Sequence, residues 1–405
     1  MKVIKADRLV DANGVVENPV VMVEEKKIVD AGPKGRVKVP DDAEVVEAGG
    51  LTLIPGLIDC HIHLYGHGTM TRGLSSEPTE VRLFRAVNEH CRQITDSGFT
   101  SVMDAGSLIG LRARNAINSG LADGPRIWAC GRAISQTAGH SDPVNLPIDW
   151  AKDPHLVRGF DGYIADGEAE CRRGVRESLR NRADFIKICT GGGGGGVVDP
   201  WWVTQFSLGE IEAIADAAHS YGRKVMSHVY AADSITRTVL GGVDIITHGN
   251  MADEGCVKLM RERGTTFVPT MTVYERFRRN SPERPTSVLY ENQFKAVKTA
   301  YDAGITLAIG TDSMGTEALP HGGSALELEL YVEKVGVPPL EALKIGTLNG
   351  AKVLGKEGEL GTVEAGKLAD IVAVKGDPLE DIKLLQEHDN IRYVMRDGKT
   401  LKDLL

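Results

Sequence analysis

The feature that most constrains this chain is a repeated alternation of short apolar runs with helical segments between residues 56 and 355. The runs are rich in Val, Ile and Thr, as buried strands are. One helical segment, 207–222, opens with Ser207 and has Glu210 three residues later, which is a capping-box pattern. Eight apolar runs are present, at 57–64, 99–106, 125–131, 184–191, 223–230, 243–249, 265–273 and 305–313.

Repeated strand–helix units of this length favour a parallel sheet with helices packed against it. Eight such units favour closure into a (β/α)8 TIM barrel, although periodicity alone leaves a doubly wound open sheet as the alternative. We therefore predict an α/β fold in which residues 56–355 form a barrel that carries the chemistry.

The two ends of the chain differ from the middle. Residues 1–55 and 356–405 contain short β-type runs such as VVMVEEKKIVDAG and LADIVAVKGDP, separated by Gly and Asn turns. We predict that the two ends combine into one small β-sandwich-like domain. The division is thus 1–55 plus 356–405 for the composite β domain, and 56–355 for the catalytic barrel.

Composition excludes several classes of partner. Asp and Glu (56) outnumber Lys and Arg (47), and a formal net charge of −9 argues against nucleic acid, which needs a clustered positive field. No stretch of about 18 apolar residues is present to span a membrane. The N-terminus lacks the apolar core of a secretory signal, and the six cysteines form no C-x-x-C pair. We expect a cytoplasmic protein with reduced thiols.

Polar residues stand where several of the apolar runs end. His61 and His63 share one face of the first strand, because strand side chains alternate, and two imidazoles so placed can reach a common metal ion. Taken alone, such a pair is more often two partly exposed histidines. His228, His248 and Asp312 also follow apolar runs, however, and their joint occurrence at the chemically active ends of barrel strands favours a site.

Lys187 lies within the apolar run Phe-Ile-Lys-Ile-Cys. Burial lowers the pKa of an amine, and a neutral amine can react with carbon dioxide to give an anionic carbamate able to bridge two cations. For the residue alone, a lysine that extends its ammonium to solvent from an edge strand is the safer interpretation.

Together these residues resemble the amidohydrolase superfamily, specifically its binuclear metal branch. The resemblance rests on PGLIDCHIHL, the lysine in an apolar strand, the later histidines and aspartate, and the segment GTVEAGKLADIVAVKGDP, so it covers nearly the whole chain. Prolidase-like and imidazolonepropionase-related members are the most similar. The resemblance implies two divalent ions, most simply zinc, with these ligands: His61, His63 and Asp312 for one ion, His228 and His248 for the other, and N-carboxylated Lys187 as the bridge.

The activity so implied is hydrolysis of a C–N (amide or peptide) bond in a dipeptide or N-acyl amino acid by a hydroxide that bridges the metals. Asp312 is the candidate general base. Tyr230, on the strand face of His228, and His140, in the loop after the third run, are candidates for stabilising the oxyanion; His140 could instead hold a substrate carboxylate. The expected partners are a small-molecule amide or peptide and further copies of the chain, since relatives form homo-oligomers.

Alternatives remain open at this point. The same centre could act on a cyclic amide, carbamate, urea or ester; a mononuclear deaminase would dispense with Lys187, and a non-catalytic relative would lose its ligands. The six glycines of 191–196 could form a mobile lid or merely a permissive loop. Trp201 and Trp202 could line the substrate pocket or pack beneath that loop. Arg276 could bind an anionic substrate, and His321 could face the pocket. No role is assigned to His67, His90, His155, His219 or His388.

Overall fold

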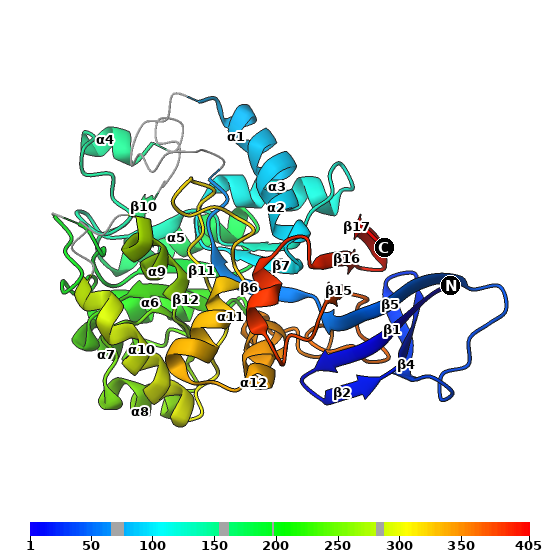
Figure 1. Cartoon of the computed structure of the whole chain (residues 1–405). Helices are drawn as coiled ribbons and strands as arrows, with labels where there is room; N and C mark the ends of the chain where they lie inside the picture. Colours follow the sequence, from blue (N-terminus) through cyan, green and yellow to red (C-terminus); the bar gives the residue numbers. More distant parts are fainter. Residues whose placement is uncertain (66–76, 154–161, 197, 281–286) are drawn as a thin grey trace.

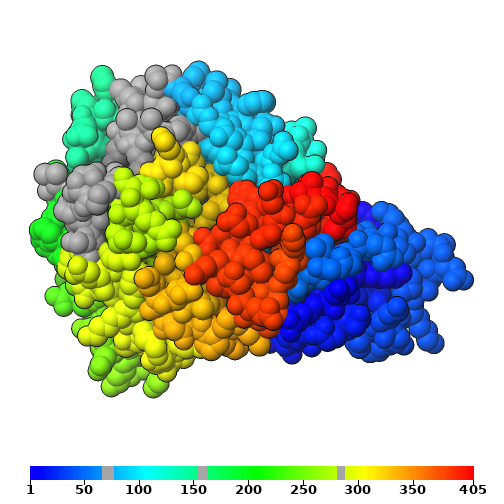
Figure 2. Space-filling view, viewed as in Figure 1, coloured from blue at the N-terminus to red at the C-terminus, as the bar shows by residue number. Residues whose placement is uncertain are grey.

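A computed structural model describes residues 1–65, 77–153, 162–196, 198–280 and 287–405. A helix-rich body and a smaller β-rich body lie side by side, and both ends of the chain are found in or beside the β-rich body (Figure 1). The space-filling view shows the C-terminal segment packed between the N-terminal strands and the helix-rich body (Figure 2).

The β-rich body is one mixed sheet of eight strands drawn from both ends of the chain. Its order is β17-β16-β15-β5-β1-β3-β4, with β2 paired to β1. The first part of the chain joins the last where β5 pairs antiparallel with β15, Pro55 opposite Ile371. The strands are hydrogen-bonded into one continuous sheet. Its strands are β1 (Lys2–Asp11), β2 (Gly14–Glu17), β3 (Pro19–Glu24), β4 (Lys27–Pro33), β5 (Glu44–Pro55), β15 (Ile371–Lys375), β16 (Ile391–Arg396) and β17 (Lys399–Asp403).

The helix-rich body contains two parallel sheets. One has the order β6-β7-β8 and the other β10-β9-β11-β12-β13-β14. Seven of the eight predicted runs contain one of these strands, and the short strands β9 and β10 were not predicted. The bounds are β6 (Leu57–Ile62), β7 (Phe99–Asp104), β8 (Arg126–Ala129), β9 (Ala133–Ser135), β10 (Gly162–Ile164), β11 (Ile186–Cys189), β12 (Val225–Val229), β13 (Ile245–His248) and β14 (Thr266–Val268).

The eighth predicted run, 305–313, lies between the two sheets without forming a regular strand. Isolated bridges link Leu307 to Phe267 of β14 and Ser313 to Ile62 of β6. The backbone N–H of Cys60 also donates to the carbonyl of Ile309 at 2.8 Å. This segment therefore connects one pair of sheet edges, but the strands that the structure describes do not merge into a single closed sheet.

Helices separate the strands and cover the parallel sheets on the outside (Figure 1). The predicted capping box is confirmed at the start of α6, where Ser207 and Glu210 bond reciprocally. The helices are α1 (Thr79–Arg85), α2 (Cys91–Asp96), α3 (Leu108–Asn118), α4 (Ile148–Ala151), α5 (Glu168–Arg180), α6 (Leu208–His219), α7 (Ala232–Leu240), α8 (Glu254–Arg263), α9 (Met271–Asn280), α10 (Ser287–Asp302), α11 (Leu326–Leu330), α12 (Pro339–Lys344) and α13 (Gly350–Leu354), with π-helical turns at Ala86–His90, Tyr331–Val335 and Ile345–Asn349 and a 3-10 turn at Ile382–Gln386.

The predicted run 265–273 is a strand only in its first part, and the helix α9 begins at Met271. Pro269 cannot donate to a sheet, which favours an end to the strand. The buried carboxyl group of Glu327 then accepts hydrogen bonds from the backbone N–H groups of Met271 (2.8 Å) and Thr272 (2.7 Å). It satisfies two donors that a helix start leaves unpaired, so a distant residue stabilises the helix here.

Candidate metal centre

All six predicted ligands lie at or near the carboxyl ends of the parallel strands. β6 carries His61 and leads directly into His63, while β11, β12 and β13 carry one ligand each and the segment 305–313 carries Asp312. These side chains line a single cavity of about 30 Å³, together with Ala105, Ala133, His140, Ser141, Cys189 and Met314. His61 and Asp312, which are 251 positions apart in the sequence, thus line the same cavity.

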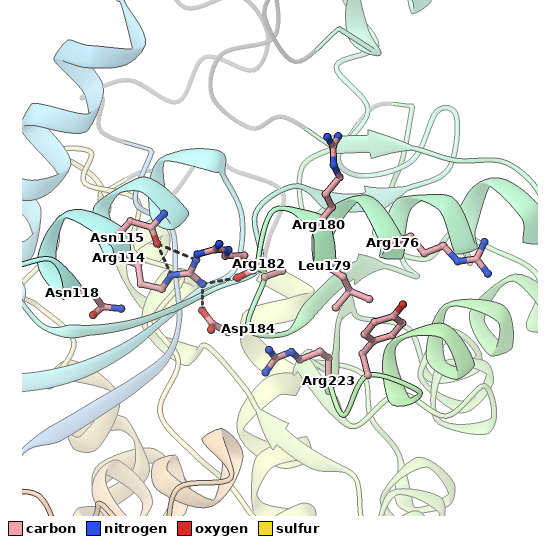
Figure 3. A pocket seen from close by; sticks show the side chains of 11 residues that line it. Arg114, Asn115, Asn118, Arg176, Leu179, Arg180, Arg182, Asp184 and Arg223 are labelled. Atoms are coloured by element: carbon pink, nitrogen blue, oxygen red, sulfur yellow. Dashed lines mark hydrogen bonds and ion pairs between the residues drawn. The ribbon is translucent and has the colours of Figure 1, made fainter.

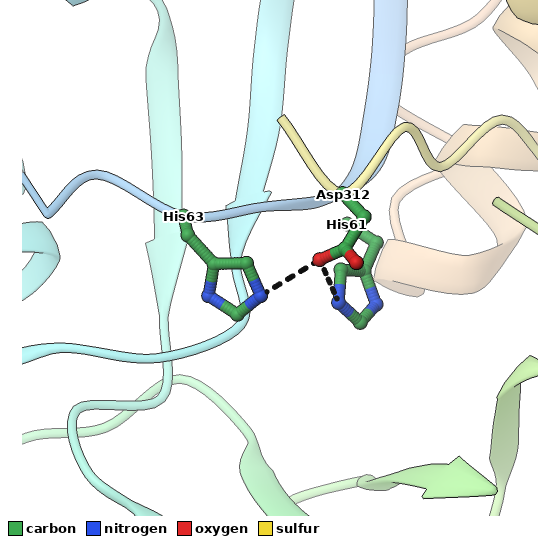
Figure 4. A group of neighbouring side chains, drawn as sticks. All are labelled: His61, His63 and Asp312. Atoms are coloured by element: carbon green, nitrogen blue, oxygen red, sulfur yellow. Dashed lines mark ion pairs between the residues drawn. The ribbon is translucent and has the colours of Figure 1, made fainter. Parts of the chain in front are cut away.

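Three of the ligands form a compact group (Figure 4). Oδ1 of Asp312 lies 3.0 Å from Nε2 of His63 and 3.4 Å from Nε2 of His61. The candidate ligand atoms of the three residues all lie within 4.8 Å of one another, and both histidines are buried. Because one carboxylate oxygen faces both imidazoles, a single cation could contact all three side chains.

The other predicted ligands adjoin this group. The ring centroids of His228 and His248 are 4.3 Å apart, and the ring centroids of His248 and His61 are 5.2 Å apart. Nζ of Lys187 donates a hydrogen bond to Oγ1 of Thr247 at 3.3 Å. The structure therefore brings all six side chains together, as the sequence predicts, while their roles as ligands stay a prediction.

Two of these residues have unusual backbone conformations. His248 has φ +69° and Asp312 has φ +56°, in the left-handed region that non-glycine residues rarely occupy. Such strain persists only where the surrounding structure holds it, and it concentrates at functional sites. Both residues lie in the turn that ends a strand or strand-like segment, so the strain coincides with the point at which their side chains enter the cavity.

Burial controls the charge of the cavity. It lowers the pKa of His61 to about 3 and those of His228 and His248 well below their ordinary value, so these rings are neutral, as metal ligation requires. Burial also lowers the pKa of Lys187 to about 8. For Asp312 burial acts in the opposite direction, but hydrogen bonds from His61 and His63 hold its pKa well below the usual range.

Residues behind the ligands orient them. Oγ1 of Thr270 lies 2.7 Å from Nδ1 of His248, and the hydroxyl of Tyr65 lies 2.8 Å from Nδ1 of His63. Asp59 accepts a hydrogen bond from the backbone N–H of His61 at 3.0 Å. Contacts of this kind fix the ring orientation of metal-binding histidines. Tyr65 is not among the residues predicted from the sequence, although alternation along the strand places it on the same face as the two histidines.

The donor set fits a divalent ion. Nδ1 of His61 is buried and has no hydrogen-bond partner among the described residues. Neutral imidazoles and an ionised carboxylate suit zinc and several other divalent ions. Nδ1 of His61 is not the atom that faces Asp312: a cation that contacts all three side chains would bind to Nε2 of His61 and of His63.

The two predicted oxyanion-stabilising residues also reach this region. The ring of Tyr230 is buried, 5.1 Å from that of His248 and 4.8 Å from that of His228. The ring of His140 stacks on His228 at 3.9 Å, and its Nδ1 lies 2.9 Å from Oδ2 of Asp199. Asp199 was not predicted, because it lies 59 positions from His140 and no local pattern connects the two.

The remaining predicted residues do not line the cavity, although His321 lies next to the backbone of His63. Trp202 is 61% exposed and does not form a wall of the pocket, whereas Trp201 packs beside the buried cluster that contains Tyr230. Arg276 lies against Gly323, and no ion pair involving it is seen among the described residues. The imidazoles of His90 and His321 are buried 4.7 Å apart. His67 and His155 fall outside the described residues, and His219 and His388 take part in hydrogen bonds elsewhere.

A larger groove of about 690 Å³ lies at the amino ends of β11 and β12. Arg114 pairs with Asp184 inside it, while the exposed guanidinium groups of Arg176, Arg180 and Arg223 point in different directions (Figure 3). The groove is thus basic and open, but its charged groups do not converge on one point.

Comparison with known proteins agrees with the geometry of the cavity. The model of the amidohydrolase family matches residues 52–401. The chain belongs to the amidohydrolase family. Ochratoxinase from Aspergillus niger is 35% identical over 372 residues, covering 86% of this chain and 75% of that protein. Imidazolonepropionase from Agrobacterium fabrum is 25% identical, covering 89% and 85% of the two chains.

Solved structures of the family give the same result. The crystal structure of a prolidase complexed with N-methylphosphonate-L-proline has a TM-score of 0.88 to this chain, with 31% identity and 99% of both chains covered. The resemblance noted from the sequence, to prolidase-like and imidazolonepropionase-related members, is confirmed. The protein is therefore an enzyme of the amidohydrolase family with a parallel-stranded α/β body and a β-rich body. No helix among the described residues has both the length and the apolar character needed to cross a membrane.

Proposed function

We propose that the protein is a metal-dependent hydrolase that cleaves the amide bond of a dipeptide or N-acyl amino acid. The observation that carries this proposal is the convergence of five imidazoles, one carboxylate and one buried lysine on a single cavity. The family supports the reaction class. Relatives named ochratoxinase and prolidase cover most of the chain. Their similarity supports a substrate in which the nitrogen of the cleaved amide bond belongs to an amino acid.

Two divalent ions, most simply zinc, would occupy the cavity. His61, His63 and Asp312 would hold one ion, and His228 and His248 the other, with N-carboxylated Lys187 between them. The low pKa of Lys187 supports this modification, because carbon dioxide reacts with the neutral amine. When bound, the ions would supply an activated water and polarise the substrate carbonyl. We further propose that the parallel strands and the segment 305–313 make up a (β/α)8 barrel.

Residues of the chain would then handle protons and charge. Asp312 is ionised and lies at the centre of the ligand group, so it can accept the proton of the attacking water and return it to the leaving nitrogen. Tyr230 would donate a hydrogen bond to the carbonyl oxygen as negative charge develops, a role supported by the 4.8 Å distance between the ring centroids of Tyr230 and His228. His140 faces the same cavity and would bind either that oxygen or the carboxylate of the substrate.

A cyclic amide is the second candidate substrate, favoured by the match to imidazolonepropionase over 89% of the chain. Carbamates, ureas and esters would use the same residues. Deamination is less well supported, because Lys187 is placed among the ligands, where a mononuclear site would not need it.

A substrate panel tests the proposal. Zinc-loaded protein is assayed against N-acyl amino acids, dipeptides, a cyclic amide, a carbamate and an ester, with Asp312→Asn as the inactive control. We expect the highest kcat/KM on an N-acyl amino acid or dipeptide and none with the control. Preference for the cyclic amide would favour the second candidate, and hydrolysis of no amide at all would refute the proposed function.

A further inference from the structure

The glycines of 191–196 are not explained by the proposed reaction, but their packing is informative. A Cβ atom added to Gly193 would lie 2.6 Å from Nδ1 of His140, and one added to Gly196 would lie 2.0 Å from Oδ1 of Asp199. A Cβ atom on Gly195, in contrast, would meet no atom within 4 Å. The chain therefore wraps tightly around His140 and Asp199, and only glycine permits this approach at two of the three positions.

Asp199 holds this turn in place. Its side chain is buried, and Oδ2 accepts a hydrogen bond from the backbone N–H of Gly193 at 3.0 Å. The same oxygen lies 2.9 Å from Nδ1 of His140. One carboxylate oxygen thus joins the glycine turn to the imidazole. A buried carboxylate must be paired to persist, and these two donors provide the pairing.

His140 is fixed from several sides. Its backbone N–H donates to Oε1 of Gln205 at 3.1 Å, and its ring lies nearly parallel to that of His228, at 11° and 3.9 Å. An imidazole that donates from Nδ1 to a carboxylate carries no hydrogen on Nε2 while it is neutral. The partner of Nδ1 therefore determines the tautomer of His140. That tautomer decides whether the nitrogen atom that faces the cavity can donate or accept a hydrogen bond.

We propose that Asp199 is a positioning residue: by accepting the Nδ1–H of His140 it sets the tautomer and plane of that ring over His228, and the glycine turn provides the space. The consequence for catalysis rests on the proposed function, in which His140 contacts the substrate. The placement of the ring does not depend on the proposed function. Asp199 does not line the cavity itself but contacts His140, which does, so its loss should act on the orientation of that imidazole.

Long-range ¹H–¹⁵N spectra of the zinc-loaded protein, labelled at histidine, test the placement directly. The signal of His140 is assigned by its loss in His140→Gln. We expect the Nδ1–H tautomer in the wild type, largely retained in Asp199→Asn, whose amide oxygen can still accept, and lost in Asp199→Ala. A wild-type ring with its hydrogen on Nε2 would overturn the proposal, as would an unchanged tautomer in Asp199→Ala; the wild-type spectrum decides even if the alanine variant does not fold.

Kinetics then test the consequence. Asp199→Ala and Gly193→Ala should each lower kcat by about 10- to 100-fold at unchanged metal content, as expected when an active-site group is misplaced. Asp199→Asn should recover part of the loss, and the matched control Gly195→Ala should stay within about 2-fold of wild type, because its Cβ atom meets open space. A wild-type enzyme that hydrolyses amides while Asp199→Ala is equally fast would overturn the positioning role. An expected spectrum without any amide hydrolysis would instead refute the proposed function alone.

Discussion

Two hollows lie at opposite ends of the parallel strands, and they differ in size, exposure and chemistry. The cavity at the carboxyl ends measures about 30 Å³ and is lined by buried histidines, Asp312 and Lys187. The groove at the amino ends measures about 690 Å³ and is lined by arginines, several of them exposed and pointing apart (Figure 3). Size therefore does not identify the chemically competent site. What distinguishes the smaller cavity is that its polar groups are buried and face one another, and that burial and hydrogen bonding shift the pKa values of His61, Lys187, His228, His248 and Asp312.

The largest effect is expected from Asp312, whose carboxylate contacts both histidines of the compact group. Asp312→Asn removes the charge and the proposed proton acceptor, so kcat/KM should fall by about 10³- to 10⁴-fold. The measurement is steady-state hydrolysis of the best substrate from the panel. Activity within 10-fold of wild type would remove Asp312 from the mechanism.

Substitution of Lys187 tests whether the cavity needs the negative charge of the proposed carbamate. Lys187→Met keeps an apolar side chain of similar length but cannot form a carbamate, and we expect a loss on the order of 10²-fold with reduced metal content. Intact-mass spectrometry under native conditions should show one added carbon dioxide in the wild type and none in the variant. An unmodified wild-type lysine in a fully metal-loaded, active enzyme would contradict the bridge.

Glu327 bonds to the chain just beyond the carboxyl end of β14. Its substitution tests whether the burial of an ionisable group there makes the unfolding free energy depend on pH. Burial raises its pKa to about 8, well above its ordinary value. The native state then binds more protons than the unfolded chain, so this residue's contribution to stability is full below about pH 4.5 and is lost as the pH rises toward 8.

Urea unfolding from pH 5 to 8 measures this effect. The unfolding free energy of wild type relative to Glu327→Gln should fall by about 1–3 kcal/mol over that range. Glu329→Gln, on the same short helix but partly exposed, is the matched control and should show a much smaller change. A difference independent of pH would mean that Glu327 has the same proton occupancy in both states.

The smallest effect is expected in the groove. Arg223→Ala removes an exposed guanidinium with no ion pair among the described residues, so kcat/KM should stay within about 2-fold of wild type and the unfolding free energy within about 0.5 kcal/mol. The same hydrolysis assay and urea titration measure both values. A 10-fold or greater loss of kcat/KM would mean that the groove contributes to catalysis, which would contradict the distinction between the groove and the cavity.

Much of the cavity was predictable from the sequence because it follows from strand geometry. The period of two places His61 and His63 on one face, and the parallel strands bring their carboxyl ends, with His228 and His248, to one side of the body. The same alternation could have revealed Tyr65. These inferences need only local pattern and the general architecture.

Other features depend on contacts between distant parts of the chain. Glu327 begins helix α9 inside a run that reads as a strand, and Asp199 meets His140 through a turn whose path no local pattern specifies. The run at 305–313 has strand composition but bonds to its neighbours only irregularly. In each case tertiary contacts decide the outcome over local preference.

Metal analysis of the purified protein tests most directly whether the cavity is a binuclear centre. Protein reconstituted with zinc and bicarbonate is freed of loose metal, and bound zinc is measured by mass spectrometry for wild type, His228→Ala and the groove variant Arg223→Ala. We expect about two ions per chain in wild type and in Arg223→Ala, and about one in His228→Ala. Wild-type protein that retains only one ion per chain, or none, would contradict the binuclear assignment.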